Sequence, residues 1–172
     1  LAVARASLGY VLTMTRQYSK GVAEGKQAYE LEPNHAYVVM IYASILTYAG
    51  KAEEAIPLFK KALRINPKPR NSYLRHYSLA LRFSGQYEES MELAKKAMEQ
   101  EPNDFIARLA MAHSCIKLGR EDEARALAQD VLRIKPDFAL EKFAKAIPIK
   151  EQADREDWFN ALRKAGLPET PP

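Results

Sequence analysis

Cysteine is nearly absent from this 172-residue chain, which contains only Cys115. A single cysteine cannot form a disulfide within the chain, so the fold must be held by packing alone. Cys115 occupies an apolar position of a helical pattern, which favours a reduced thiol in the core over a reactive one. We therefore expect a cytoplasmic protein.

Long hydrophobic runs are also missing. No stretch approaches the ~18 consecutive apolar residues of a membrane span, so no membrane insertion is expected. Residues 1–14 resemble a targeting segment in part, but Arg5, Gly9 and their match to later segments argue against one. The chain begins at Leu1, without a methionine and already within an amphipathic pattern, which we interpret as a domain cut from a longer protein.

Sequence motifs of catalytic and metal sites are missing as well. The three histidines, His35, His76 and His113, have no nearby cysteine or HExxH partner, and phosphate-binding glycine loops are absent from the sequence. Acid pairs such as Glu53-Glu54 and Glu88-Glu89 recur where helices begin, where negative charge stabilises a helix N-terminus. We predict no enzyme activity, no metal site and no cofactor.

Four prolines recur in the same local setting, at Pro33, Pro67, Pro102 and Pro136. Their separations are 34, 35 and 34 residues. A fixed period between 20 and 50 residues is typical of repeat architectures, which mostly present surfaces for binding.

Aligning the chain on these prolines gives columns with a physical meaning. Two columns hold small residues, which let paired helices approach closely, and a third holds apolar residues at helical spacing. The first small column is Gly9, Ala43, Ser78 and Ala112; the second is Gly21, Ala55, Ser90 and Ala124; the apolar column is Leu12, Leu46, Leu81 and Cys115. A further column of larger residues is Leu8, Tyr42, Tyr77 and Met111.

Glycines separate the two helices of each unit. Gly50, Gly85 and Gly119 suit a left-handed position after a helix, whereas Arg16 occupies that position in the first unit. Each unit is therefore predicted to be an αα-hairpin that ends at a proline turn.

These columns resemble the tetratricopeptide repeat family, most clearly over residues 43–67. The resemblance implies an all-α right-handed superhelical solenoid of αα-hairpins with a C-terminal helical cap. It divides one continuous domain into repeats 2–35, 36–69, 71–104 and 105–138, followed by capping helices at 139–168.

A narrower resemblance concerns residues 66–74, 136–140 and 162–169. They are similar to the C-terminal region of bacterial signalling proteins in which such an array follows a class III adenylate/guanylate cyclase domain. This resemblance implies a regulatory part of a larger bacterial signalling protein, without cyclase chemistry in the present residues.

The aromatic pair Trp158-Phe159 lies in a segment predicted as a helix that Gly166 ends. One interpretation is a capping helix that covers the open end of the last repeat, because terminal repeats need a polar outer face. The alternative is an exposed aromatic docking site. A short helix with Phe138, Phe143 and Ile147 is expected before it, stopped by Pro148.

In the resembled family, the first helix of each hairpin lines a concave groove. The residues that the packing columns leave free are our candidate peptide-binding residues: Tyr10, Tyr37, Met40, Ser44, Tyr48, Arg75, Arg82, His113 and Lys117. The family's carboxylate clamp is not supported, because Ala6, Tyr10 and Ile41 stand at its positions. An alternative is that these side chains are packed within the groove or simply solvated.

Acids are absent between Glu54 and Glu88, where seven cations fall. Such a band favours an acidic partner over nucleic acid, since its cations are divided among inner helix, outer helix and connection. We predict a protein–protein interaction or scaffolding module, with Arg75 and Arg82 binding an acidic peptide. Self-association into a homodimer is the alternative, and binding of a small molecule or nucleic acid is a weaker one.

Overall fold

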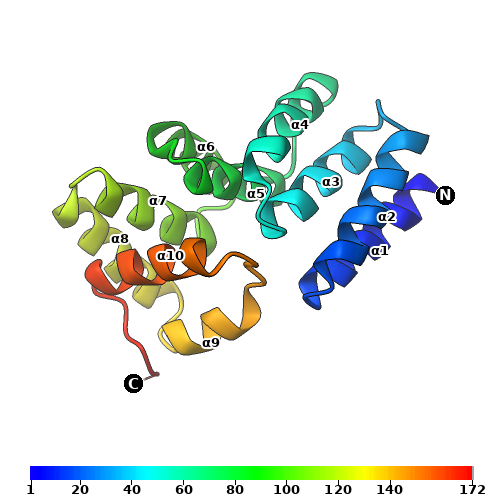
Figure 1. The fold of residues 1–172 in the computed structure, drawn as a ribbon. Helices are drawn as coiled ribbons and strands as arrows, with labels where there is room; N and C mark the ends of the chain where they lie inside the picture. Colours follow the sequence, from blue (N-terminus) through cyan, green and yellow to red (C-terminus); the bar gives the residue numbers. More distant parts are fainter. Residues whose placement is uncertain (172) are drawn as a thin grey trace.

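A computed structural model describes residues 1–171 and is helical throughout (Figure 1). Eight helices of 13 or 14 residues are followed by a short helix and a last one of 13 residues. They are α1 (Ala2–Met14), α2 (Tyr18–Leu31), α3 (Ala36–Tyr48), α4 (Ala52–Ile65), α5 (Asn71–Phe83), α6 (Tyr87–Gln100), α7 (Phe105–Lys117), α8 (Glu121–Ile134), α9 (Leu140–Ala146) and α10 (Gln152–Lys164). Within residues 1–171, no helix is both long and apolar enough to cross a membrane.

Helices α1 to α8 pair as four successive hairpins, and the hairpins stack side by side. The first helices α1, α3, α5 and α7 contact one another in order and form the inner layer. Each second helix packs on its own partner, and α2, α4 and α6 also pack on the first helix of the next hairpin. This arrangement confirms the all-α solenoid predicted from the repeat.

The small columns mark the places where paired helices cross most closely. A Cβ atom added to Gly21 would lie 2.8 Å from the carbonyl oxygen of Gly9, and one added to Gly9 would lie 2.8 Å from that of Gly21. In the third hairpin, the hydroxyl oxygens of Ser78 and Ser90 are 2.7 Å apart and both residues are fully buried. Small side chains are therefore required at these positions by backbone proximity.

The turns follow the predicted chemistry. Gly50, Gly85 and Gly119 adopt φ values of +80°, +72° and +75°, and Arg16 takes the same left-handed region at +64°. The second helices end at Leu31, Ile65, Gln100 and Ile134, each two residues before one of the repeating prolines.

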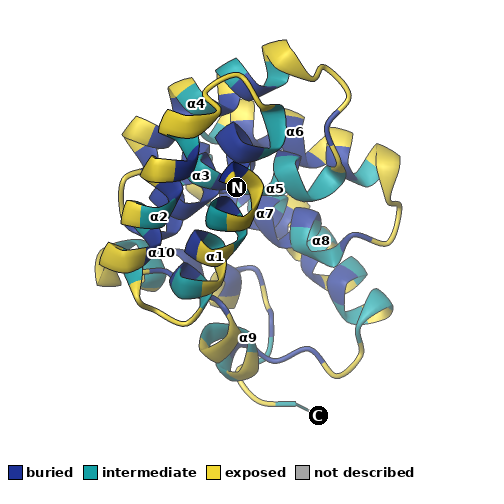
Figure 2. Ribbon diagram, turned by 90° about the vertical axis from the view of Figure 1, so that its right-hand side faces the viewer, coloured by how far each residue is buried: buried dark blue, intermediate teal, exposed yellow. Residues whose placement is uncertain are grey.

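Burial is continuous through the stacked hairpins and into the C-terminal segment (Figure 2). One cluster of buried residues centres on α3 to α6 and another joins α5, α7 and α8 to residues 138–167. The predicted short helix is confined to α9, so Phe138 and Ile147 lie outside it. Ile147, Pro148 and Ile149 are buried in an extended linker between α9 and α10.

Candidate functional site

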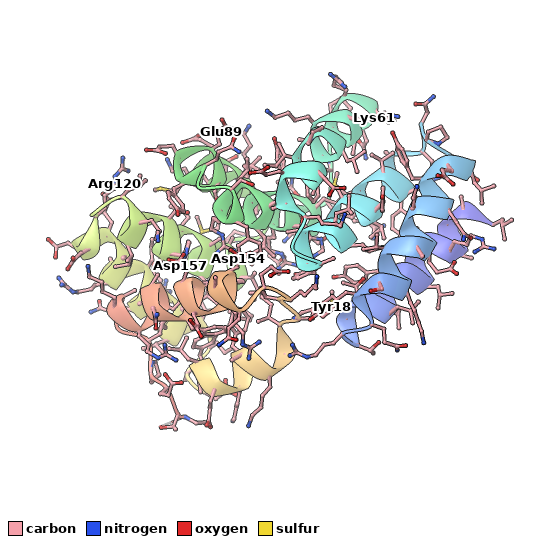
Figure 3. All side chains as sticks on the ribbon, viewed as in Figure 1. Tyr18, Lys61, Glu89, Arg120, Asp154 and Asp157 are labelled. Atoms are coloured by element: carbon pink, nitrogen blue, oxygen red, sulfur yellow. The ribbon has the colours of Figure 1, made fainter. Side chains whose placement is uncertain are left out.

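The C-terminal segment lies across the inner layer of the solenoid. Helix α10 packs against α7, the inner helix of the fourth hairpin, and the linker before it reaches the first and second hairpins (Figure 1). The backbone N–H of Lys150 donates to the carbonyl of Tyr48 at 3.1 Å, and the Tyr18 hydroxyl donates to the carbonyl of Pro148 at 3.2 Å. Tyr18 is labelled beside this linker in Figure 3. The chain thus closes part of its own concave face.

An acidic side chain of α10 is held by two predicted groove residues. This residue is Asp157, which is labelled in Figure 3. Its Oδ2 lies 3.0 Å from Nε2 of His113, and its Oδ1 lies 2.5 Å from Nζ of Lys117. These contacts lower the pKa of Asp157 below its usual value, the hydrogen bond from His113 contributing most. Burial lowers the pKa of His113 to about 4, so the neutral imidazole donates from Nε2 to the carboxylate.

Arg82 is packed beneath the same helix. Its guanidinium carbon lies 4.2 Å from the centroid of the Trp158 ring, a cation–π contact, and only 4% of the residue is exposed. Its Nε and Nη1 are buried and donate to no acceptor within residues 1–171. Burial lowers the pKa of Arg82 to about 9, which still leaves it charged at neutral pH. A buried guanidinium without a carboxylate partner costs several kcal/mol.

Arg75 has an acidic partner within the solenoid. Its Nη1 lies 3.2 Å from Oδ1 of Asp104, whose side chain also caps α7 by accepting from the backbone N–H of Ala107 at 3.0 Å. The pairing fixes Arg75 along the groove while leaving its side chain 29% exposed.

His76, which was not among the predicted groove residues, organises three inner helices. Ser44 Oγ donates to the Met40 carbonyl at 2.9 Å, so Nδ1 of His76 must donate to Ser44, 3.0 Å away. Nε2 then accepts from the Tyr10 hydroxyl at 3.4 Å. Burial lowers the pKa of His76 to about 4, which keeps the ring neutral. These partners lie 32 and 66 residues away along the chain, so no local pattern could reveal them.

The nine predicted groove residues divide into two groups. Tyr10, Tyr37, Arg75 and Lys117 keep partly or fully exposed side chains. The other five are buried and are not free contact residues in this structure: Met40, Ser44, Tyr48, Arg82 and His113.

The reasons for burial differ. Met40 belongs to the core between the second and third hairpins, and Ser44 is enclosed by its bonds to Met40 and His76. Tyr48, Arg82 and His113 belong to the inner surface but are covered by the C-terminal segment.

Trp158 is only 1% exposed, so the exposed docking-site interpretation is wrong. It contacts the ring of Phe83 on α5 and that of Phe143 on α9, with centroid distances of 6.5 and 5.7 Å. In the sequence, only the aromatic pair Trp158-Phe159 marked this position. Which helices pack on Trp158 depends on the fold and is not visible in the sequence.

The remaining cations of the acid-free stretch do not gather in one place. Lys60 and Arg64 are exposed on the outer helix α4, and Lys61 contacts Tyr29 at 3.2 Å, whereas Arg75 and Arg82 belong to the inner helix α5. The acid pairs of the sequence lie in the first turns of α4, α6 and α8. In the part of the chain that the structure describes, no three His, Cys, Asp or Glu side chains cluster to hold a metal ion.

Comparison with known proteins identifies the family of the repeats. Two family models described as tetratricopeptide repeat match residues 36–69 and 83–146, which together make up more than half of the chain. No curated protein matches it in sequence.

Solved structures share its fold. YrrB, described as a TPR protein with an unusual peptide-binding site, is 22% identical with a TM-score of 0.64, covering 96% of this chain and 84% of that one. A MamA structure labelled MSR-1 is 20% identical with a TM-score of 0.67, covering 95% and 94%. MamA from Desulfovibrio magneticus RS-1 is 16% identical with a TM-score of 0.69, covering 79% and 76%. With the recurring columns and the stacked hairpins, these matches show that the chain is built from tetratricopeptide repeats.

Proposed function

We propose that this chain is a non-catalytic protein-interaction module whose concave face binds an amphipathic helix with an acidic residue. The observation that carries the proposal is α10 itself: the groove already holds a helix, with Asp157 between His113 and Lys117. The similarity to YrrB, described as having a peptide-binding site, supports a peptide or protein as the ligand.

The chemistry of the contact defines the partner. His113 and Lys117 provide two donors for one carboxylate, and charge-assisted bonds of this kind are the stronger hydrogen bonds of proteins. Trp158, next to Asp157 in the sequence, provides the apolar anchor against Arg82 and Phe83. A partner helix therefore needs an acid followed by a large aromatic or aliphatic residue, and it competes with α10 for the same surface.

Neighbouring residues extend this surface beyond α10. Arg75 remains partly exposed, and Tyr37 packs edge-on against Tyr73 at 6.4 Å beside a cavity of about 240 Å³. We propose that the acidic partner predicted from the sequence continues along these residues toward the second hairpin.

The test uses a fluorescently labelled peptide of residues 150–167 added to the full chain. Asp157→Lys in the chain places a cation beside Lys117 and Arg82 and weakens docking of its own helix. Because a charge-assisted bond is worth about 1.5–3 kcal/mol, this variant should bind the peptide roughly 10-fold or more tightly than wild type.

Glu156→Lys is the matched control, because Glu156 is exposed on the same helix and bonds only to Gln152 within residues 1–171. It should bind the peptide as wild type does. Equal peptide affinity in all three proteins, with circular dichroism showing the same helix content, would remove the groove as a helix-binding site.

Self-association is a second candidate, favoured by the surface of α1. Leu8 and Val11 on this helix and Leu1 directly before it are 49%, 57% and 84% exposed. Light scattering on wild type and on Leu8→Glu/Val11→Glu tests it. A wild-type monomer over the micromolar range would rule this candidate out.

The cyclase-linked parent is a separate proposal that rests on the resemblance of residues 66–74, 136–140 and 162–169 alone. In such a parent the module would regulate or localise the signalling domain. The sequence encoded upstream of Leu1 tests it, and a parent without a cyclase-type domain would contradict it.

A further inference from the structure

A cavity of about 220 Å³ lies where the C-terminal segment meets the inner helices. Its walls come from the inner helices α1, α3, α5 and α7 on one side and from residues 143–148 and Trp158 on the other. Most of the lining is apolar, including Leu79, Ile106 and Phe143. An engineered cavity of about 150 Å³ is known to hold benzene, so this one has room for a single ring and a small polar group.

The polar side chains of the cavity are all potential donors. Arg75, Arg82, His76 and Tyr48 line it, and none of its lining residues within 1–171 is acidic. Both nitrogens of His76 are already bonded, to Ser44 and Tyr10. That leaves the side chains of Arg75, Arg82 and Tyr48 as the candidate donors to a ligand, and both arginines act electrostatically on the Tyr48 hydroxyl.

The charges around the cavity leave one cation without a partner. Arg75 is paired with Asp104, and Lys117 is paired with Asp157, which also accepts from His113. Arg82 is 96% buried, and its Nε and Nη1 donate to no acceptor in residues 1–171. Asp157 acts on Arg82 at a distance but makes no hydrogen bond to it in the described structure.

We propose that this cavity binds a small free organic monocarboxylate, with the carboxylate at Arg82 and its apolar body against Leu79, Ile106 and Phe143. One negative charge balances the unpaired guanidinium, and a planar carboxylate matches its forked donors. The apolar walls favour an aromatic or short aliphatic acid over a phosphate or a polar sugar acid. The site shares Arg82 and Trp158 with the helix-binding surface but does not include Asp157, and it needs the C-terminal segment in place, because that segment forms one wall.

The probes are benzoate and hexanoate, each compared with its uncharged amide, added to the intact chain. Trp158 is the only tryptophan and lines the cavity, so its fluorescence reports binding directly, and calorimetry gives the affinity. At least one acid should bind and shift the emission, whereas benzamide and hexanamide should bind at least 10-fold more weakly.

Arg82→Met keeps the volume and the apolar contact with Trp158 but removes the charge, and it should weaken acid binding by roughly 10- to 100-fold. Lys60→Met, on the exposed outer helix α4, is the matched loss of one cation and should leave binding unchanged. Should Arg82→Met fail to fold, Arg75→Met provides the second variant and should also lower the affinity. Equal binding of acid and amide, no binding of either acid, or unchanged affinity in the folded arginine variants would overturn the proposal.

Discussion

The two ends of this solenoid differ in how much of their apolar surface is covered. At the N-terminal end, hairpin α1–α2 packs through the close crossing of Gly9 and Gly21 and leaves Leu8 and Val11 exposed. At the C-terminal end, α10 and its linker fold back over the inner layer and bury Trp158, Phe159 and Leu162. The repeated sequence therefore determines how each hairpin folds. Residues outside the repeats determine which inner helices become covered.

The largest predicted effect tests that difference at the covered end. Trp158→Ala removes a side chain that is 1% exposed and should lower the free energy of unfolding by about 3–5 kcal/mol. Leu8→Ala, at the open end, removes a side chain that is 49% exposed and should change it by less than about 0.5 kcal/mol. Chemical denaturation measures both, and similar losses in the two variants would contradict the comparison.

Acid should destabilise the middle and the C-terminal part of the fold through His76 and His113, and it reaches the N-terminal hairpin only through the bond between Tyr10 and His76. His76 and His113 have folded pKa values of about 4, below the usual 6.5. The unfolded chain therefore takes up protons first, and stability present above pH 6.5 is lost as the pH falls toward 4. Each histidine contributes up to about 1.4 kcal/mol per pH unit in that range.

Denaturation midpoints at pH 7, 6 and 5 measure this slope. The variant His76→Gln/His113→Gln should show a flatter dependence than wild type. Parallel curves for the two proteins would mean that these histidines do not stay neutral in the fold.

At the open end, the crossing of α1 and α2 depends on the absence of a side chain. Gly21→Ala places a Cβ 2.8 Å from the Gly9 carbonyl oxygen and should cost about 1–3 kcal/mol, although alanine is the better helix former. Ala23→Gly, on the exposed face of the same helix, should cost about 1 kcal/mol through propensity alone. A stabilised Gly21→Ala variant would show that these helices do not cross as closely as described.

The smallest effect concerns the first turn. Arg16 holds a left-handed backbone at φ +64°, so Arg16→Gly should stabilise the chain by up to about 1 kcal/mol. Its hydrogen bond to the Lys145 carbonyl, 3.2 Å long and exposed, offsets part of that gain. Gly85→Ala, at φ +72° with open space around it, is the reverse change and should destabilise. Thermal unfolding distinguishes these outcomes.

The fold was predictable because its determinants are local and recur. Gly50, Gly85 and Gly119 mark turns, and the small residues at Ser78 and Ser90 mark a helix crossing, all within one repeat. Period and residue type therefore specify the hairpin, its turn and its inner face.

The groove residues were predictable only in part, because the helix that fills the groove, α10, is far from them in the sequence. His113 and Asp157 are 44 residues apart, and Tyr18 and Pro148 are 130 residues apart. Sequence reasoning placed Arg82, His113 and Lys117 in the groove but predicted the acidic partner for Arg75 and Arg82. It could not show that an acid of the same chain, Asp157, pairs with His113 and Lys117 instead, since helix packing decides which surface α10 covers.

The most direct test of the central claim, that the C-terminal helix fills the groove, is quenching of the single tryptophan by acrylamide. In wild type, Trp158 should show blue-shifted emission and low accessibility, and the Glu156→Lys control should behave in the same way. Asp157→Lys should raise the accessibility several-fold while circular dichroism still shows the helical repeats. Wild-type Trp158 quenched as readily as free tryptophan, or an Asp157→Lys variant as protected as wild type, would contradict this account of the groove.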